Sequence, residues 1–212
     1  MIPLHEQRRP RSFDDVIGQA KAIERIRTAG EPGGNAYWIS GSSGTGKTTL
    51  ARIIAAQVAD RFYTIEYDSA DQFKQAELDS MTEYMELYSL GRGGRAWIIN
   101  EAHGLRSAIV RQLLGVIERL PEHVVLIFTT TRDGQAKLFE DDIDAGPLLS
   151  RCIKVALTNQ GLAKAMAPKL RAGAQAVGLN GKAEVDYVKL MQRCHNNVRE
   201  AWAEIQAGAM MG

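Results

Sequence analysis

The stretch Ala36-Tyr-Trp-Ile-Ser-Gly-Ser-Ser-Gly-Thr-Gly-Lys-Thr-Thr49 decides the fold of this chain. A short apolar run, Tyr37–Ser40, leads into the spacing Gly-x-x-x-x-Gly-Lys-Thr, and a run with helical spacing, Leu50–Ala59, follows. A strand, a glycine-rich turn and a helix in this order are typical of a phosphate-binding loop, or P-loop. The alternative is an ordinary Gly/Ser turn, but all fixed positions of the motif match and both flanking elements are present.

Each residue type in the P-loop has a chemical reason to be there. Gly41, Gly44 and Gly46 permit backbone conformations that let successive N–H groups point at phosphate oxygens, and the following helix adds its positive N-terminal end. Lys47 can reach the β- and γ-phosphates, and the hydroxyl of Thr48 is placed to ligate Mg²⁺. The predicted contacts of the loop are Gly41, Ser42, Ser43, Gly44, Thr45, Gly46, Lys47, Thr48 and Thr49.

The composition bounds the class of protein. The chain has 212 residues, is 45% hydrophobic and carries a net charge of +1, which suits one core or one core with a small appended domain. Near-neutral charge gives no overall electrostatic argument for nucleic acid, so such contacts must come from local patches. Cys152 and Cys194 lie far apart without a second ligand nearby, which argues against a zinc site or a disulfide. With no signal-like or membrane-length apolar run, we expect a cytoplasmic protein without a membrane partner.

Apolar runs and helical spacing alternate along the first three quarters of the chain and predict an α/β fold. A mainly parallel sheet covered by helices is expected over residues 1–157, a small helical lid over 158–207 and a frayed tail over 208–212. The predicted strands are Tyr37–Ser40, Phe62–Tyr67, Ala96–Asn100, Val124–Thr130 and Cys152–Leu157. The predicted helices are Arg52–Ala59, Gln72–Leu90, Ala108–Arg119, Gln160–Val177, Ala183–Cys194 and Val198–Ala207.

A second part of the site is predicted where the strand Ala96–Asn100 ends. Chemistry beside the phosphates needs a ligand for the magnesium shell and a carboxylate that polarises water. Glu101 suits the second role, and Asn100 occupies the first. A neutral amide lacks the charge that helps to hold Mg²⁺, so we expect weak magnesium binding and slow turnover. An ordinary buried strand that ends in polar residues is the alternative, and His103 is interpreted as a structural residue.

Several short motifs around the P-loop resemble those of the AAA+ ATPases, in particular the clamp loaders. The run Gln7–Gln19 resembles the start of clamp-loader subunits, and Ile65–Ala70 is similar to the motif after their second strand. Gly91–Arg95 resembles the basic turn before their Walker B strand, Leu120–Val124 a turn of the bacterial clamp-loader ATPase subunit, and Leu149–Cys152 the S-R-C motif of that clade. Singly these matches are weak, but they occur in order over nearly the whole chain.

The resemblance implies ATP and Mg²⁺ as cofactors and gives roles to further residues. Val16, Ile17 and Gly18 would lie against the adenine base. Thr130 resembles sensor 1, a hydroxyl that holds the attacking water or the γ-phosphate, and Thr131 is the neighbouring candidate.

Two arginines receive roles from the same resemblance. Arg151 resembles an arginine finger supplied to the nucleotide of an adjacent subunit, where it would stabilise charge on the transferring phosphoryl group. Arg199 resembles sensor 2, which would report the γ-phosphate to the lid. The alternative for each is a solvated surface charge.

The sequence also departs from the family pattern. Asn100 replaces the usual aspartate, and the acidic segment Arg132–Pro147 is longer than expected, as a solvated loop or a partner contact. The sequence ends after the lid, where clamp-loader subunits continue into a helical collar. The resemblance therefore implies that a ring, if one forms, is held by the AAA+ domains alone or by another protein.

DNA is implied by the family and only weakly by the residues. Arg92, Arg95, Arg106 and Arg111 could contact phosphates without reading sequence, and solvated surface charge is the alternative. We expect an ATPase stimulated by DNA that acts as a clamp-loader-like switch in replication or repair, with a sliding clamp as a candidate partner. The alternatives are another AAA+ remodeller, such as a helicase loader or branch-migration motor, and a nucleotide-binding module with little hydrolysis.

Overall fold

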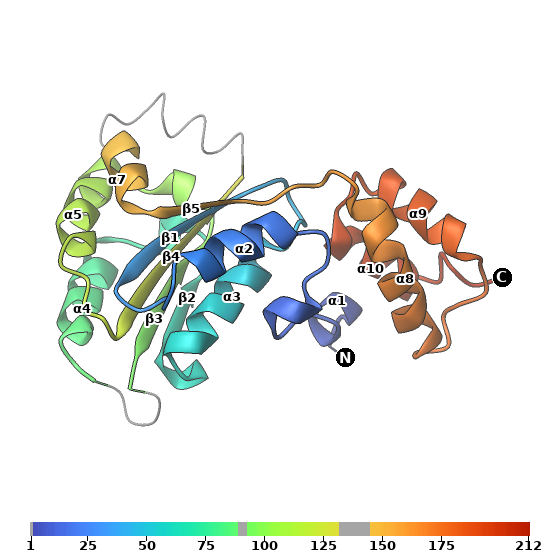
Figure 1. Cartoon of the computed structure of the whole chain (residues 1–212), viewed down its shortest axis with the longest axis horizontal. Helices are drawn as coiled ribbons and strands as arrows, with labels where there is room; N and C mark the ends of the chain where they lie inside the picture. The colour runs from blue at the N-terminus through green and yellow to red at the C-terminus, as the bar shows by residue number, and fades with distance from the viewer. Residues whose placement is uncertain (1, 89–92, 132–144) are drawn as a thin grey trace.

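The structure is a computed structural model that describes residues 2–88, 93–131 and 145–212. Its centre is a parallel sheet of five strands in the order β2-β3-β4-β1-β5 (Figure 1). The predicted α/β class and parallel sheet are therefore confirmed. The strands are β1 (Asn35–Ser40), β2 (Thr64–Tyr67), β3 (Arg95–Ile99), β4 (Val124–Thr130) and β5 (Ile153–Ala156).

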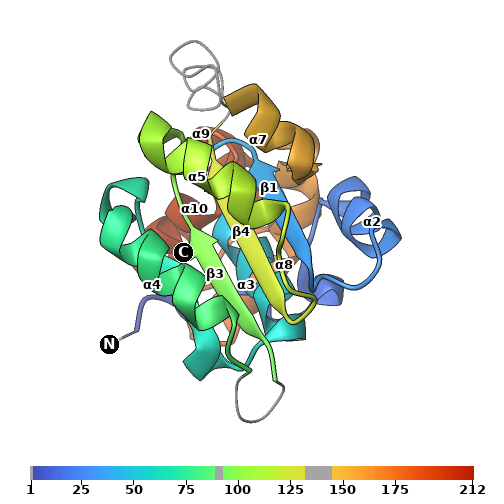
Figure 2. The ribbon, with the colours of Figure 1, turned by 90° about the vertical axis from the view of Figure 1, so that its left-hand side faces the viewer.

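Helices cover both faces of the sheet because its strands are apolar on both sides. Trp38 and Phe128 point into a core made with α4 (Gln75–Met85), α5 (Ser107–Ile117) and α7 (Ala145–Arg151). Their neighbours Tyr37 and Ile127 point to the opposite face, where α2 (Ala20–Thr28) and α3 (Lys47–Val58) pack. Successive strand residues face opposite ways, so one strand serves two cores. Figure 2 views the sheet from the side that α4, α5 and α7 cover.

Several elements differ from the prediction. The helices α1 (Leu4–Gln7), α2 and α7 were not predicted, and α7 begins at Ala145, inside the segment that was expected to be a loop. Residues 132–144 of that segment and residues 89–92 lie outside the described residues. The predicted helix Gln72–Leu90 is shorter, because α4 begins after Lys74, whose N–H donates to Glu77 Oε2 at 3.0 Å. Short 3₁₀ helices lie at Phe13–Asp15, Arg61–Tyr63, Ala70–Gln72 and Ala102–Gly104.

The lid consists of α8 (Leu162–Gln175), α9 (Glu184–Arg193) and α10 (Val198–Gln206), which lie beside the sheet domain (Figure 1). These helices have a core of their own, and Leu4 of α1 is part of it. The prediction of a frayed tail was wrong. Met210 is buried, and its carbonyl accepts a hydrogen bond of 2.7 Å from the N–H of Gly181.

Candidate nucleotide-binding site

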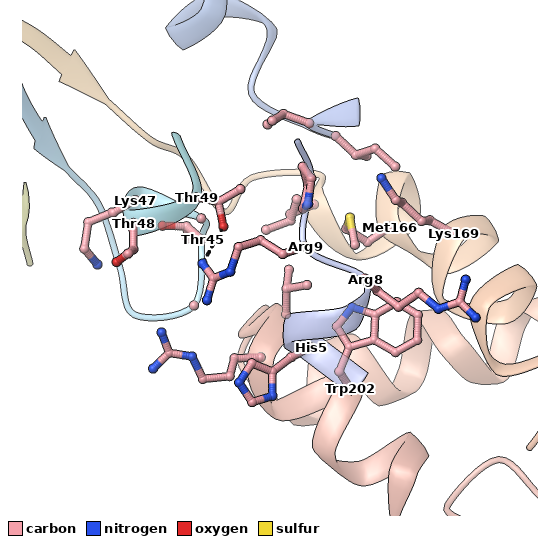
Figure 3. A pocket seen from close by; sticks show the side chains of 18 of the residues that line it. His5, Arg8, Arg9, Thr45, Lys47, Thr48, Thr49, Met166, Lys169 and Trp202 are labelled. Carbon is pink, nitrogen blue, oxygen red and sulfur yellow. Dashed lines mark hydrogen bonds between the residues drawn. The ribbon is translucent and has the colours of Figure 1, made fainter. Parts of the chain in front are cut away.

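A pocket that is open to solvent lies between the sheet domain and the lid. The P-loop forms one wall, the lid helices form the other, and residues from the N-terminal segment lie between them (Figure 3). The predicted site residues that line it are Val16, Ile17, Ser43, Gly44, Thr45, Gly46, Lys47, Thr48, Thr49, Glu101 and Arg199. The predicted residues outside its lining are Gly18, Gly41, Ser42, Asn100, Thr130 and Arg151.

The P-loop is shaped by two glycines with positive φ, Gly44 at 72° and Gly46 at 102°. At Gly44 a side chain is excluded twice, by this backbone conformation and by space. A Cβ there would lie 1.9 Å from the side-chain oxygen of Asn197. The carbonyl of Gly44 also accepts a hydrogen bond of 3.2 Å from the N–H of Val198, the first residue of α10. The P-loop and the lid are therefore in direct contact.

Lys47 lies across the P-loop with little exposure to solvent. Its Nζ donates to the carbonyls of Gly41 and Ser42, at 3.0 Å each, so these two residues support the lysine from outside the pocket lining. Burial lowers the pKa of Lys47, the carboxylate of Glu101 opposes that effect, and the cation of Arg199 adds to it. Charged groups from two other elements thus influence Lys47 at the pocket.

The residues that were predicted to hold magnesium, Thr48 and Asn100, have side chains that fit a hard cation. The hydroxyl of Thr48 donates to Asn100 Oδ1 at 3.0 Å, so the lone pairs of the Thr48 oxygen stay available to a metal ion. The hydroxyl of Thr129, buried in β4, donates to the same Oδ1 at 2.9 Å. Asn100 therefore accepts hydrogen bonds as an aspartate could, but without negative charge.

Sequence reasoning missed the partner behind Asn100. The amide nitrogen of Asn100 donates to Glu66 Oε1 and to the carbonyl of Tyr67, at 3.1 Å each. Glu66 stands in β2, which pairs with β3, so only the sheet brings it next to Asn100. The motif Ile65–Ala70 drew attention to this segment without giving Glu66 a role.

Glu101 adopts an unusual backbone conformation for a residue with a side chain, with φ of 51°. One oxygen of its carboxylate lies 3.5 Å from His103 Nδ1, and this nitrogen is 3.1 Å from the hydroxyl oxygen of Thr130. The Thr130 hydroxyl donates to the carbonyl of Thr131 at 3.1 Å, which identifies the His103 Nδ1–H as the donor to Thr130. His103, interpreted from sequence as structural, thus joins the candidate base to the candidate sensor.

The part of the pocket that was predicted to hold the adenine base includes residues that were not predicted. Val16 and Ile17 line it, whereas Gly18 packs against Leu162 at the start of α8. The indole of Trp202 and the side chain of Arg8 lie on the lid side (Figure 3). Trp202 belongs to α10, which is far from the P-loop in the sequence, so no sequence motif links the two.

The N-terminal segment links the two walls of this pocket. Arg9 donates to the hydroxyl of Thr49 at 2.9 Å and is hydrogen-bonded to the carboxylate of Glu6 (Figure 3 shows the first contact). The N–H of Leu4 donates to the side-chain oxygen of Gln206 in α10 at 2.9 Å. Residues 4–9 therefore touch both α3 and the lid.

Arg151 lies away from the pocket, at the end of α7. Its Nε donates to Glu118 Oε1 at 2.8 Å, and its Nη1 donates to the carbonyl of Pro147 at 3.1 Å. Its side chain is 37% exposed. The structure thus does not join Arg151 to the nucleotide pocket of its own chain, and its role as a finger stays a prediction.

The described arginines among those considered for DNA lie at opposite ends of β3. Arg95 begins β3, donates to the carbonyl of Leu87 at 2.8 Å and lies over the rings of Tyr63 and Tyr84. Arg106 and Arg111 follow the other end of β3, at the start of α5 and within it, and are exposed. Arg92 lies outside the described residues.

Comparison with known proteins identifies the family of this chain. Residues 37–156 match the family described as "ATPase family associated with various cellular activities (AAA)". DNA polymerase III subunit gamma/tau of Mycobacterium tuberculosis is 29% identical over an alignment of 156 residues that covers 61% of this chain and 27% of that protein. DNA polymerase III subunit tau of Escherichia coli is 28% identical over an alignment of 171 residues that covers 69% of this chain and 25% of that protein. The chain thus spans about a quarter of the length of these relatives.

Solved structures show the same fold. A RuvB mutant of Thermotoga maritima matches with a TM-score of 0.70 at 22% identity, over 93% of this chain and 64% of that one. Domain III of the replication initiation protein DnaA from Thermotoga maritima matches with a TM-score of 0.57 at 17% identity, over 88% and 80%. In the described part of the chain, none of the helices has the length and apolar character of a membrane span. On its P-loop, its sheet and the family match over more than half its length, the chain is a member of the AAA family of ATPases.

Proposed function

We propose that this chain binds ATP with Mg²⁺ and hydrolyses it as a clamp-loader-like switch associated with DNA. The observation that carries the proposal is the convergence of Lys47, Thr48, Glu101 and Arg199 on one pocket whose walls belong to two domains. A ligand there contacts the P-loop and the lid together, so its binding and its hydrolysis bias how the two domains sit against each other.

Each residue has a defined task in this mechanism. The P-loop N–H groups and Lys47 hold the β- and γ-phosphates, and Thr48 holds the metal through its hydroxyl oxygen. When bound beside Thr48, Mg²⁺ would supply positive charge to the phosphate oxygens. Glu101 orients water for in-line attack and accepts its proton, while His103 keeps the Thr130 hydroxyl next to that carboxylate.

The proposal of an oligomer rests on Arg151. Because this arginine lies outside the pocket of its own chain, a finger role requires a neighbouring subunit whose nucleotide it reaches. Similarity to DNA polymerase III subunits supports a role in DNA replication. A sliding clamp is the candidate partner of this proposal. Arg106 and Arg111 supply the exposed cations for DNA phosphates.

One observation favours a second function. Asn100 leaves the magnesium side without a carboxylate directly after β3, which suits a nucleotide-dependent scaffold with little turnover.

Steady-state ATP hydrolysis across a magnesium titration, with and without primed and single-stranded DNA, separates these functions. Hydrolysis that DNA stimulates supports the switch, and a sliding clamp is then tested by co-purification. Tight ATP binding without hydrolysis under all conditions would establish the scaffold. Absence of ATP binding would refute both.

A further inference from the structure

The side chain of Asn100 uses every hydrogen-bonding position that an amide has. Its oxygen accepts from the hydroxyls of Thr48 and Thr129, and its nitrogen donates to Glu66 and to the carbonyl of Tyr67. A carboxylate and a carbonyl can only accept, whereas hydroxyls can adapt. The chemistry therefore determines the amide orientation, with nitrogen toward Glu66 and oxygen toward Thr48.

Glu66 is itself held in place from the other side. Arg52 donates through Nε to Glu66 Oε2 at 2.7 Å and through Nη2 to Oε1 at 3.1 Å, a two-point contact that fixes the plane of the carboxylate. Arg52 follows Thr48 by four residues in α3, so both project from the same side of that helix. Thr48, Asn100, Glu66 and Arg52 are thus joined by hydrogen bonds in series, and the backbone of α3 between Thr48 and Arg52 closes them into a ring.

From this ring we propose that Glu66 is a positioning residue of the magnesium site, which acts through Asn100 and supplies the carboxylate that position 100 lacks. This inference rests on the nucleotide and magnesium binding proposed above. A hydrogen bond from an amide N–H to a carboxylate is charge-assisted, and it makes the carbonyl oxygen of the same amide a stronger acceptor. The stronger acceptor keeps the hydrogen of the Thr48 hydroxyl turned toward Asn100, which leaves the oxygen of Thr48 to the metal.

The same geometry explains why an asparagine suits this position. An aspartate at position 100 would put a second carboxylate about where the amide nitrogen now meets Glu66, at 3.1 Å. Two carboxylates at such a distance repel each other, which would destabilise the fold. A glutamine at position 66 would remove that conflict, because its amide could donate to the aspartate.

The pairing is tested first without nucleotide or metal. Melting temperatures near neutral pH are measured for the wild-type chain, Asn100→Asp, Glu66→Gln and the double variant. We expect Asn100→Asp to lower the melting temperature alone and to cost much less in the Glu66→Gln background. Additive shifts would show that the two side chains do not act as a pair and would overturn the proposal.

The metal function is tested by ATP binding, measured calorimetrically in EDTA and across a magnesium titration. Glu66→Gln should raise the magnesium concentration for half-maximal binding about tenfold, as expected when a residue behind a metal ligand is changed, and leave binding in EDTA unaltered. The matched control is Glu83→Gln, an exposed carboxylate on α4, which should change neither value. An unaltered magnesium requirement in Glu66→Gln would overturn the proposal.

The proposed function and the role of Glu66 can be disproved separately. If the wild-type chain does not bind ATP, the proposed function is wrong, and the melting-temperature cycle alone decides the pairing. If Asn100→Asp lowers the magnesium requirement by the same factor with and without Glu66→Gln, position 100 acts alone. In that case the proposed function stands and Glu66 has no part in it.

Discussion

The cationic side chain in the nucleotide pocket, Lys47, and the one at the end of α7, Arg151, are held in different ways. Lys47 is 8% exposed and is bonded to two backbone carbonyls of its own loop, so the fold presets its position. Arg151 is held by the carboxylate of Glu118, which is itself 54% exposed. Exposed ion pairs contribute only about 0–1 kcal/mol, so this contact can be exchanged for another anion at small cost. The difference separates a cation that the fold fixes inside the pocket of its own chain from a cation that is exposed at the surface.

The largest effect is expected from Lys47→Ala, which removes the preset cation of the pocket. We expect ATP affinity to fall on the order of 10²–10⁴-fold and hydrolysis to be abolished, because each charge-assisted hydrogen bond contributes about 1.5–3 kcal/mol. Calorimetric ATP binding and phosphate release measure both. Lys21→Ala, an exposed cation on α2, is the control. Hydrolysis at the wild-type rate in Lys47→Ala would show that the pocket is not the site.

Arg151→Ala tests whether the second region acts on another chain. ATP affinity should stay near the wild-type value while hydrolysis falls on the order of 10³-fold, since Arg151 is outside its own pocket. Mixing Arg151→Ala with Lys47→Ala should restore part of the activity, because one subunit supplies the finger and the other supplies the pocket. No recovery on mixing, under conditions in which wild-type subunits associate, would exclude action between subunits.

Glu101→Gln separates binding from chemistry within the pocket. The amide keeps the size of the side chain but cannot accept a proton, so hydrolysis should fall about 10²-fold or more while ATP stays bound. Single-turnover hydrolysis and nucleotide retention on a desalting column measure the two. If Glu101→Gln hydrolyses ATP as fast as the wild-type chain, the base lies elsewhere in the pocket.

A smaller effect is expected from Glu118→Gln, which weakens the contact that holds Arg151. Because the arginine is then freer to reach a neighbouring nucleotide, turnover at low protein concentration should rise about two- to fivefold, in line with the strength of an exposed ion pair. Rates over a dilution series measure it, and Glu122→Gln in the turn before β4 is the control. A fall in the rate would indicate that Glu118 holds Arg151 in the position from which it reaches the neighbouring nucleotide.

The smallest effect concerns the N-terminal segment beside the pocket. The side-chain hydrogen bond between Arg9 and Glu6 lowers the pKa of the Glu6 carboxyl below its usual value of 4.5. A carboxylate with a lowered folded-state pKa stabilises the fold above its unfolded pKa, and this stabilisation disappears as the pH falls through the folded-state value. Wild-type and Glu6→Gln chains should therefore differ in melting temperature at neutral pH and converge as the pH drops below 4.5. A difference that is constant with pH would rule out the carboxylate charge as its cause.

Sequence reasoning worked where the information is local. The P-loop was predicted from residue types at fixed separations, and β4 was predicted with its observed bounds, Val124–Thr130. The lid helices α8, α9 and α10 were found from their apolar spacing to within two residues at each end. The four-residue α1 has no such signal, because so short a helix is stable only through tertiary packing, here of Leu4 in the lid core.

The sequence by itself determined the P-loop, the parallel α/β class and the candidate site residues Lys47, Thr48 and Glu101. Each of these features depends on residues that are close together in the sequence. Only the tertiary structure decided that Glu66 supports Asn100, that residues 4–9 touch both α3 and the lid, and that Arg151 faces away from its own pocket. These contacts depend on which strands are neighbours and in what register, and on how the lid docks. The backbone of the whole molecule sets those relations, and no short motif contains them.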